Sequence, residues 1–237
     1  MNSTNKTARF AGFLYLLLAL IAPIGLMYVP AKLIVYGDAS TTARNIVASQ
    51  SLYLLGIASQ LVSTVIFIFL AMVLYRLLKA VDQPRAVLMV VLVLVQVPIS
   101  FLNEVNAIAA LVLARGAAFL SIFDQPQRDA LAMLFLNLHY QGILVNQVFW
   151  GLWLFPFGLL VFRSRFLPRF LGIWLVLNGA AYVVMSFTGL MLPRYYNMVY
   201  KGSIPLLLGE MVTILWFLIL GAKPHLQQPA SSASAGD

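Results

Sequence analysis

The run VLMVVLVLVQVPISFLNEVNAIAALVLA, residues 87–114, is apolar enough to cross a bilayer but carries a carboxylate. That carboxylate is Glu104, which lies between Asn103 and Asn106 in the segment SFLNEVNA, residues 100–107. A charged side chain at the centre of a bilayer costs at least about 2.5–3.5 kcal/mol. The run therefore predicts a membrane-spanning helix with a polar site in it.

The composition of the whole chain agrees with this prediction. Of its 237 residues, 62% are hydrophobic and only 9% are charged, and the mean hydropathy is +0.94. Soluble domains carry about 25% charged residues, so the chain is expected to be an integral membrane protein with the lipid bilayer as its partner. The net charge of +8 comes from basic residues at the ends of apolar runs, where anionic lipid headgroups lie. No nucleic-acid partner is expected.

Six segments reach the roughly 20 mostly apolar residues that a spanning helix needs. They cover residues 10–29, 51–77, 86–114, 136–162, 168–191 and 203–221. We expect an all-α membrane fold: one domain, residues 1–225, formed by a bundle of six transmembrane helices. The polar residues 226–237 are expected to form a disordered tail.

The basic residues predict the orientation. Nine Lys and Arg residues fall on the side of the N-terminus, in short turns beside the spans, and six fall on the other side. Because Lys and Arg near the ends of spans favour the cytoplasm, both termini are predicted to be cytoplasmic. The connections on the opposite side, residues 30–50 and 115–135, are expected to be loops that close or cap the bundle.

Only two acids lie inside the predicted spans, Glu104 and Glu210, and Lys and Arg are absent from the interiors of the spans. A buried carboxyl without a counter-charge favours its neutral form, so both are candidate catalytic or proton-binding groups. Other polar residues share helical faces with them or with one another. The candidate ligand-binding residues are Gln60, Asn103, His139, Asn146, Asn178 and Tyr182.

Other residues in the spans are given structural roles. The first span shows no polar face, so it is expected to face lipid or to be structural. His139 is placed near the outer end of its span. The aromatic residues of segment 149–155, together with Trp174, are expected to contact lipid or to pack at the membrane interface.

Several chemistries lack the residues they need. The chain has no Cys, which excludes thiolate catalysis and Cys-ligated metals. Its predicted spans hold one His and no Lys, so neither a multi-His metal centre nor a Schiff-base chromophore is expected. No phosphate-binding glycine motif is present. We expect no metal and no cofactor.

Three stretches resemble a known family: TARFAGFLYL, residues 7–16; YGDASTTARNI, residues 36–46; and FRSRFLPRFLG, residues 162–172. They are similar to a bacterial family of multi-span membrane proteins known only as a domain of unknown function. The resemblance covers nearly the whole chain. It implies a bacterial origin and a multi-pass protein of the inner membrane, and it implies no activity.

Three functions remain compatible with the residues. The first is a protein that binds a lipophilic small molecule or a membrane partner in a small polar intramembrane site. The second is a small proton-coupled transporter that uses Glu104 or Glu210. The third is a membrane enzyme of the acid-assisted isomerase or cyclase type, with Glu104 as the acid and a lipid-soluble substrate. The sequence carries no signal for an oligomeric state.

Overall fold

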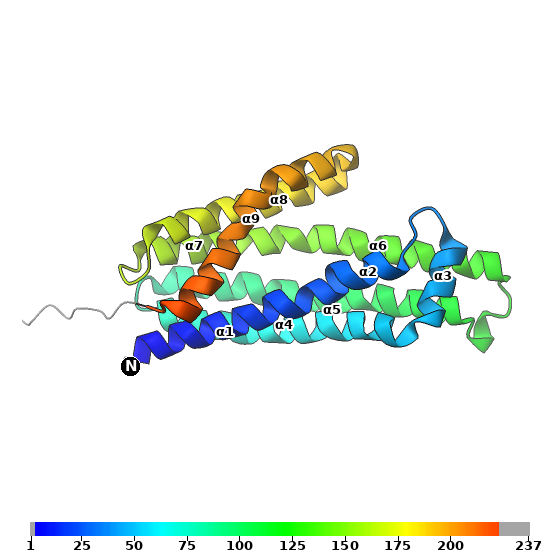
Figure 1. Ribbon diagram of the computed structural model, residues 1–237, viewed down its shortest axis with the longest axis horizontal. Coiled ribbons are helices and arrows are strands. Elements are labelled where there is room, and N and C mark those ends of the chain that lie inside the picture. The colour runs from blue at the N-terminus through cyan, green and yellow to red at the C-terminus, as the bar shows by residue number, and fades with distance from the viewer. Residues whose placement is uncertain (1–2, 223–237) are drawn as a thin grey trace, which may run out of the picture.

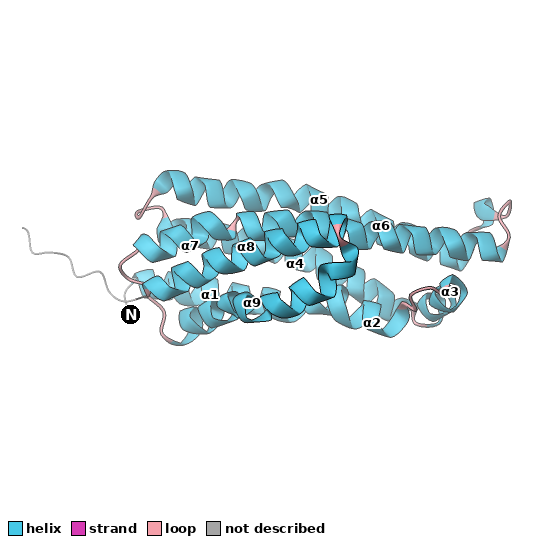
Figure 2. Ribbon diagram, turned by 90° about the horizontal axis from the view of Figure 1, so that it is seen from above, coloured by secondary structure: helices cyan, strands magenta, loops and turns pink. Residues whose placement is uncertain are grey.

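A computed structural model describes residues 3–222, and within this range all regular structure is helical (Figures 1 and 2). The predicted tail, residues 226–237, lies outside the described residues. The α-helices are α1 (Ser3–Pro23), α2 (Val29–Leu33), α3 (Ala39–Ala48), α4 (Gln50–Leu78), α5 (Gln83–Arg115), α6 (Gln125–Leu152), α7 (Leu154–Arg163), α8 (Arg169–Met191) and α9 (Tyr196–Ile219). A π-helical turn, η1 (Ile24–Tyr28), joins α1 to α2, and short 3-10 turns, η2 (Ala118–Leu120) and η3 (Pro193–Tyr195), precede α6 and α9.

Six helical segments of residues 3–222 are long and apolar enough to cross a membrane, which confirms the predicted number of spans. Their ends differ from those predicted. The fourth begins at Gln125, because the Asp124 side chain and Gln127 form a reciprocal capping box there. Hydropathy marks the part of a helix that suits hydrocarbon, whereas capping groups mark where the helix itself begins.

The two connections that were expected to be loops are largely helical, so that expectation is wrong. Residues 30–50 contain the end of α2 and all of α3, and residues 115–135 contain the first turns of α6. Helix α3 starts because Asp38 accepts a hydrogen bond from the Thr41 amide at 2.8 Å. Hydrogen bonds from Thr41 also hold the pKa of the Asp38 carboxyl below its usual value. At this end of the bundle, α3 packs against α5 and α6.

The six spans form a closed ring in which each packs against the next. Helix α1 contacts α4, α4 contacts α5, α5 contacts α6, α6 contacts α8, α8 contacts α9, and α9 returns to α1. The start of α1 and the end of α9 lie at the same end of the bundle, and α3 lies at the other (Figure 1). The ring leaves an interior that side chains from all six spans can reach.

Two apolar cores fill this interior at its two ends. One core, which includes Leu70, Phe157 and Phe217, lies at the end where α1 begins. A second, separate core, which includes Ile46 and Leu136, joins α3 to the far ends of α4, α5 and α6. Two cores at opposite ends leave the central section free for polar groups.

Glycine pairs bring the fourth and fifth spans into backbone contact. A Cβ added to Gly158 would lie 2.6 Å from the Gly172 carbonyl oxygen, and one added to Gly172 would lie 2.5 Å from the Gly158 oxygen. Gly151 and Gly179 face each other in the same way, about two helical turns from the first pair. Small residues allow such close approach between membrane helices, where packing replaces the hydrophobic effect as the driving force.

The substitution Gly158→Val should therefore destabilise the bundle by about 1–3 kcal/mol, because the facing atoms are backbone and cannot move aside cheaply. Gly202→Val is the matched control, since a Cβ there meets nothing within 4 Å. Unfolding of both variants in mild detergent measures the difference. Equal stability of the two variants would contradict this packing.

A charged cluster stabilises the turn between α4 and α5. Asp82 caps α5 by accepting a hydrogen bond from the Arg85 amide at 3.1 Å, and it also pairs with the guanidinium groups of Arg85 and Arg163. The Arg85 amide first, and then the two guanidinium groups, hold the pKa of Asp82 below its usual value. Because the pKa of Asp82 is lower in the folded than in the unfolded state, its ionised form stabilises the fold at pH values above the unfolded-state pKa, near 4. This stabilisation is lost as the pH falls toward the folded-state pKa.

Asp82→Asn should thus lower the melting temperature at pH 7, and the difference from the parent protein should shrink toward pH 3. Asp82→Ala removes the capping oxygen as well as the charge, so its melting temperature should fall below that of Asp82→Asn and separate the cap from the ion pairs. If the melting temperature of Asp82→Asn stays below that of the parent protein by the same amount across this pH range, the charge has no such role.

Candidate functional site

The middle of the ring encloses a cavity of about 470 Å³ that lies between the two apolar cores. All six spans contribute to its wall, most of which is apolar. The polar and aromatic residues that line it are Tyr15, Gln60, Ser63, Thr64, Phe67, Gln96, Ser100, Asn103, Glu104, Asn146, Trp150, Trp153, Tyr182, Tyr200 and Glu210. Both predicted acids therefore border one cavity.

Glu210 is surrounded by neutral hydrogen-bonding groups. The Tyr15 hydroxyl donates a hydrogen bond to its Oε1 atom, and the Asn178 amide donates one to Oε2 at 3.2 Å. Tyr182 faces the same carboxyl group. Three spans, α1, α8 and α9, thus meet at this side chain.

The contribution of Tyr15 corrects the expectation that the first span is only lipid-facing or structural. Tyr15 is buried and lines the cavity. The sequence did carry a signal for it, because membrane proteins concentrate Tyr at the membrane interface, whereas Tyr15 lies well inside an apolar run.

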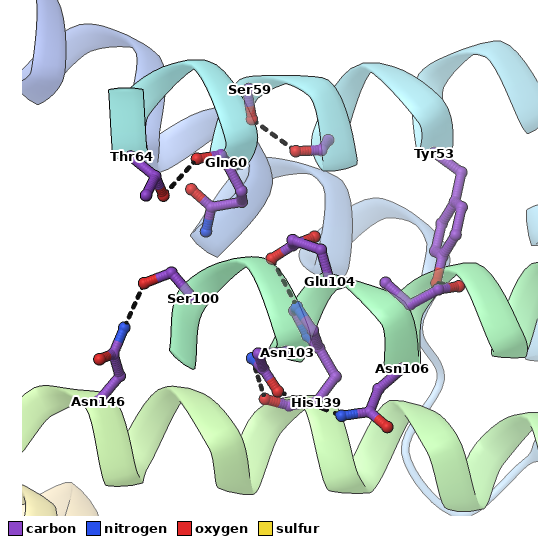
Figure 3. A network of polar contacts seen from close by, with 12 residues as sticks. Tyr53, Ser59, Gln60, Thr64, Ser100, Asn103, Glu104, Asn106, His139 and Asn146 are labelled. Carbon is purple, nitrogen blue, oxygen red and sulfur yellow. Dashed lines mark hydrogen bonds and ion pairs between the residues drawn. The ribbon is translucent and has the colours of Figure 1, made fainter. Parts of the chain in front are cut away.

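Glu104 forms the second polar centre, with His139 of α6 (Figure 3). The His139 Nε2 atom lies 3.0 Å from Glu104 Oε1. Asn103 supports the pair by donating a hydrogen bond to the His139 carbonyl at 3.0 Å. Asn106 in turn donates to the Asn103 side chain at 3.3 Å. Asn103 therefore fastens α5 to the helix that carries the partner of Glu104, and Asn106 supports Asn103 from within α5.

The sequence placed His139 near the outer end of its span, but α6 itself continues well beyond that point. Because α6 begins at Gln125, His139 lies about four turns along it. Glu104 therefore has a partner that can carry positive charge, on a neighbouring helix. Sequence reasoning missed this pair because hydropathy placed the start of the fourth span at residue 136.

Asn146 and Gln60 complete this part of the wall. The Asn146 amide donates a hydrogen bond to Ser100 Oγ at 2.7 Å, and the Ser100 hydroxyl donates to the Gln96 carbonyl at 3.0 Å. Gln60 extends from α4 toward the α5 turn that carries Glu104 (Figure 3).

Several buried oxygen atoms along the cavity have no hydrogen-bond donor within residues 3–222. They belong to Ser63, Gln96 and Asn146, all of which line the cavity, and to Asn178 beside Glu210. Buried polar atoms are almost always paired. Unpaired acceptors beside an open volume indicate a place where donors from water or a ligand complete the site.

The structure brings all eight predicted site residues to this region. Glu104, Glu210, Gln60, Asn103, Asn146 and Tyr182 line the cavity, and His139 and Asn178 bind the two acids. Sequence reasoning assigned Trp150 and Trp153 to lipid or interfacial contacts. Trp153 is instead buried, stacked on Phe157, and in the cavity wall.

The two acids lie at different depths. Glu210 is ~14 Å along α9 from the end at Ile219, and Glu104 is ~29 Å along α5 from Arg85 at the same end of the bundle, at about 1.5 Å per residue. With a hydrocarbon thickness of about 30 Å, Glu210 lies near the middle and Glu104 near the far boundary.

The cavity opens sideways between α1 with η1 and the first half of α9. Met27, Ile204, Leu208 and Met211 line it and are also 44–61% exposed. Figure 1 shows the reason, because α9 runs obliquely from the end of α8 to the start of α1 and so diverges from η1 and α2. Leu208 and Met211 lie within ~17 Å of Ile219, at a depth where the surrounding medium is hydrocarbon.

Fold and cavity together define a multi-span helical membrane protein with a mainly apolar central chamber that two acids border. The chain belongs to the family DUF4386, a domain of unknown function, whose model matches residues 10–221. No curated protein and no solved structure matches the chain.

His139→Leu should cost roughly 1–3 kcal/mol of unfolding free energy, because it leaves the buried Glu104 carboxyl without its partner. The double variant Glu104→Gln/His139→Leu should regain part of this loss, since no uncompensated charge remains. Asn137→Leu is the control, because Asn137 is exposed on the same helix and its amide bonds only to the Met133 carbonyl. Strictly additive effects of the two site substitutions would refute the pairing.

Proposed function

We propose that this protein binds a lipophilic small molecule in the central cavity, within the bacterial inner membrane. The single observation that carries the proposal is the chamber of about 470 Å³ bordered by two acids in a mainly apolar wall. Ligand sites typically enclose about 300–1,000 Å³, with apolar linings and a few placed polar groups. A chamber closed by apolar cores at both ends and open toward hydrocarbon suits a ligand that arrives from the bilayer.

The membrane and the orientation are part of the proposal. At the end where α1 begins, the described residues carry eight Lys and Arg residues and one acid, Asp82. The end formed by α3 has six basic residues and three acids in its connections and first turns: Asp38, Asp124 and Asp129. The greater positive excess supports placing the start of α1 and the end of α9 in the cytoplasm. The resemblance of segments 7–16, 36–46 and 162–172 to bacterial membrane proteins supports the inner membrane.

A proton-linked transporter is the second candidate, and one observation favours it. Glu104 lines the central cavity and also a second, small cavity of about 40 Å³ on its other side, which His139 borders. A cavity of at least about 10–15 Å³ can hold a water molecule. Glu104 and His139 could therefore pass a proton between the two cavities.

The cavity proposal is tested by native mass spectrometry of the purified protein. We expect a bound lipophilic molecule, and Ala22→Trp should weaken its retention strongly, because Ala22 lines the cavity and an indole would occupy part of its volume. Leu20→Trp is the control, since Leu20 is on the same helix but faces outward. If the parent protein carries no such molecule, or if Ala22→Trp retains it as fully as the parent protein does, the proposal is wrong.

Transport of the bound molecule across a membrane distinguishes the two candidate functions. In proteoliposomes, a carrier should move it at a rate that depends on a pH gradient, and Glu104→Gln should reduce that dependence at least tenfold. A binding protein should retain the molecule without flux in either variant. Flux that is equal in the parent protein and Glu104→Gln would remove Glu104 from any transport mechanism.

A further inference from the structure

The Glu210 end of the cavity combines a carboxyl group with an aromatic wall. Tyr15, Trp150, Trp153 and Tyr182 all line the chamber. Tyr15 donates a hydrogen bond to Glu210, and Tyr182 faces the same carboxyl. Aromatic rings therefore border the acid from α1 and α8.

Ring contacts extend this wall to α6. The Tyr15 and Trp153 ring centroids lie 6.1 Å apart with their planes at 57°. Those of Trp150 and Tyr182 lie 6.0 Å apart in an edge-to-face arrangement. Aromatic rings present a negative face, and cages of such rings are used to recognise ammonium groups.

The charges of the lining point to the same ligand chemistry. Among the described residues, no Lys, Arg or His lines the central cavity, whereas two Glu residues do. Glu104 has His139 as its partner, but the partners of Glu210 are phenols and an amide. An ionised carboxyl in a low-dielectric region is costly without a positive group beside it.

The unpaired acceptors agree with this reading. Gln96 and Asn146 line the cavity, are at least 94% buried, and each carry a carbonyl oxygen without a donor within the described residues. An ammonium group has donors and positive charge and no acceptor. A phosphate or carboxylate head would add a third negative group to a wall that already holds two acids.

We propose that the ligand is a lipophilic ammonium compound, whose cationic head lies against Glu210 and the rings of Tyr15, Trp150, Trp153 and Tyr182. The proposal rests on the proposed function, because it names the ligand class of the same cavity. The head supplies the counter-charge that the chain does not provide. The apolar tail lies along Ile204, Leu208 and Met211 and extends through the side opening into the bilayer.

The test compares three probes that share one chain length: dodecylammonium, dodecanol and dodecanoate. Binding to the full chain in phosphatidylcholine nanodiscs is measured by calorimetry, with the signal of empty nanodiscs subtracted. We expect the ammonium probe to bind at least tenfold more tightly than dodecanol, and dodecanoate to bind most weakly. Glu210→Gln should abolish the preference for the ammonium probe and leave dodecanol binding nearly unchanged.

Two further variants keep the test decisive. Asp38→Asn is the matched control and should retain the preference, because Asp38 caps α3 outside the cavity and Asn keeps a capping oxygen. Trp150→Leu removes one ring without touching the acid and should weaken ammonium binding several-fold more than dodecanol binding. Trp150→Leu also tests the ammonium assignment if Glu210→Gln does not fold.

The outcomes separate the two proposals. If none of the probes binds, the proposed function itself fails. If the probes bind with equal affinity, or if Glu210→Gln and Trp150→Leu both keep the parent preference, the cavity binds lipophilic molecules but the ammonium assignment is wrong.

Discussion

A carboxyl group inside hydrocarbon costs at least about 2.5–3.5 kcal/mol when charged, and this chain places two in its spans. Each is surrounded by groups from neighbouring helices: Glu104 by His139 and Asn103, and Glu210 by Tyr15 and Asn178. These contacts link α5 to α6 and join α1, α8 and α9. The need to surround the two acids explains why polar residues gather at mid-bundle while apolar cores occupy both ends.

This separation into two cores and a polar middle also defines what the protein can do. Close packing at the glycine pairs and in the end cores fixes the frame, and the oblique path of α9 leaves a side of the chamber uncovered. This opening leads into the chamber without passing through either core. The acid near mid-membrane has no cationic partner among the described residues that line the cavity, whereas the acid near the far boundary is paired with His139. The two acids therefore have different electrostatic surroundings.

The sequence predicted the class, the number of spans and the residues that gather, because hydrophobic length and the rarity of in-span polar groups are local properties. It could not predict partners across helices. The Glu104–His139 pair depends on where α6 begins, which the cap at Asp124 decides and hydropathy does not. Trp153 was misplaced because an aromatic side chain in an apolar run looks the same in the sequence whether it faces lipid or a cavity, whereas the position of Tyr15 deep in such a run was a signal that went unused. The side opening results from the crossing of α9 over α1, a tertiary feature without a local signal.

Cysteine labelling tests most directly whether the chamber is open to lipid and closed to water, because the chain has no Cys of its own. In Ser63→Cys the new thiol lies in the cavity wall. It should react with a membrane-soluble maleimide and resist a membrane-impermeant one added to both sides of the bilayer. Ser121→Cys, in an exposed turn, should react with the impermeant reagent, and Ser59→Cys, buried outside the chamber, should react with neither. Labelling of Ser63→Cys by the impermeant reagent would show an aqueous vestibule and contradict the account.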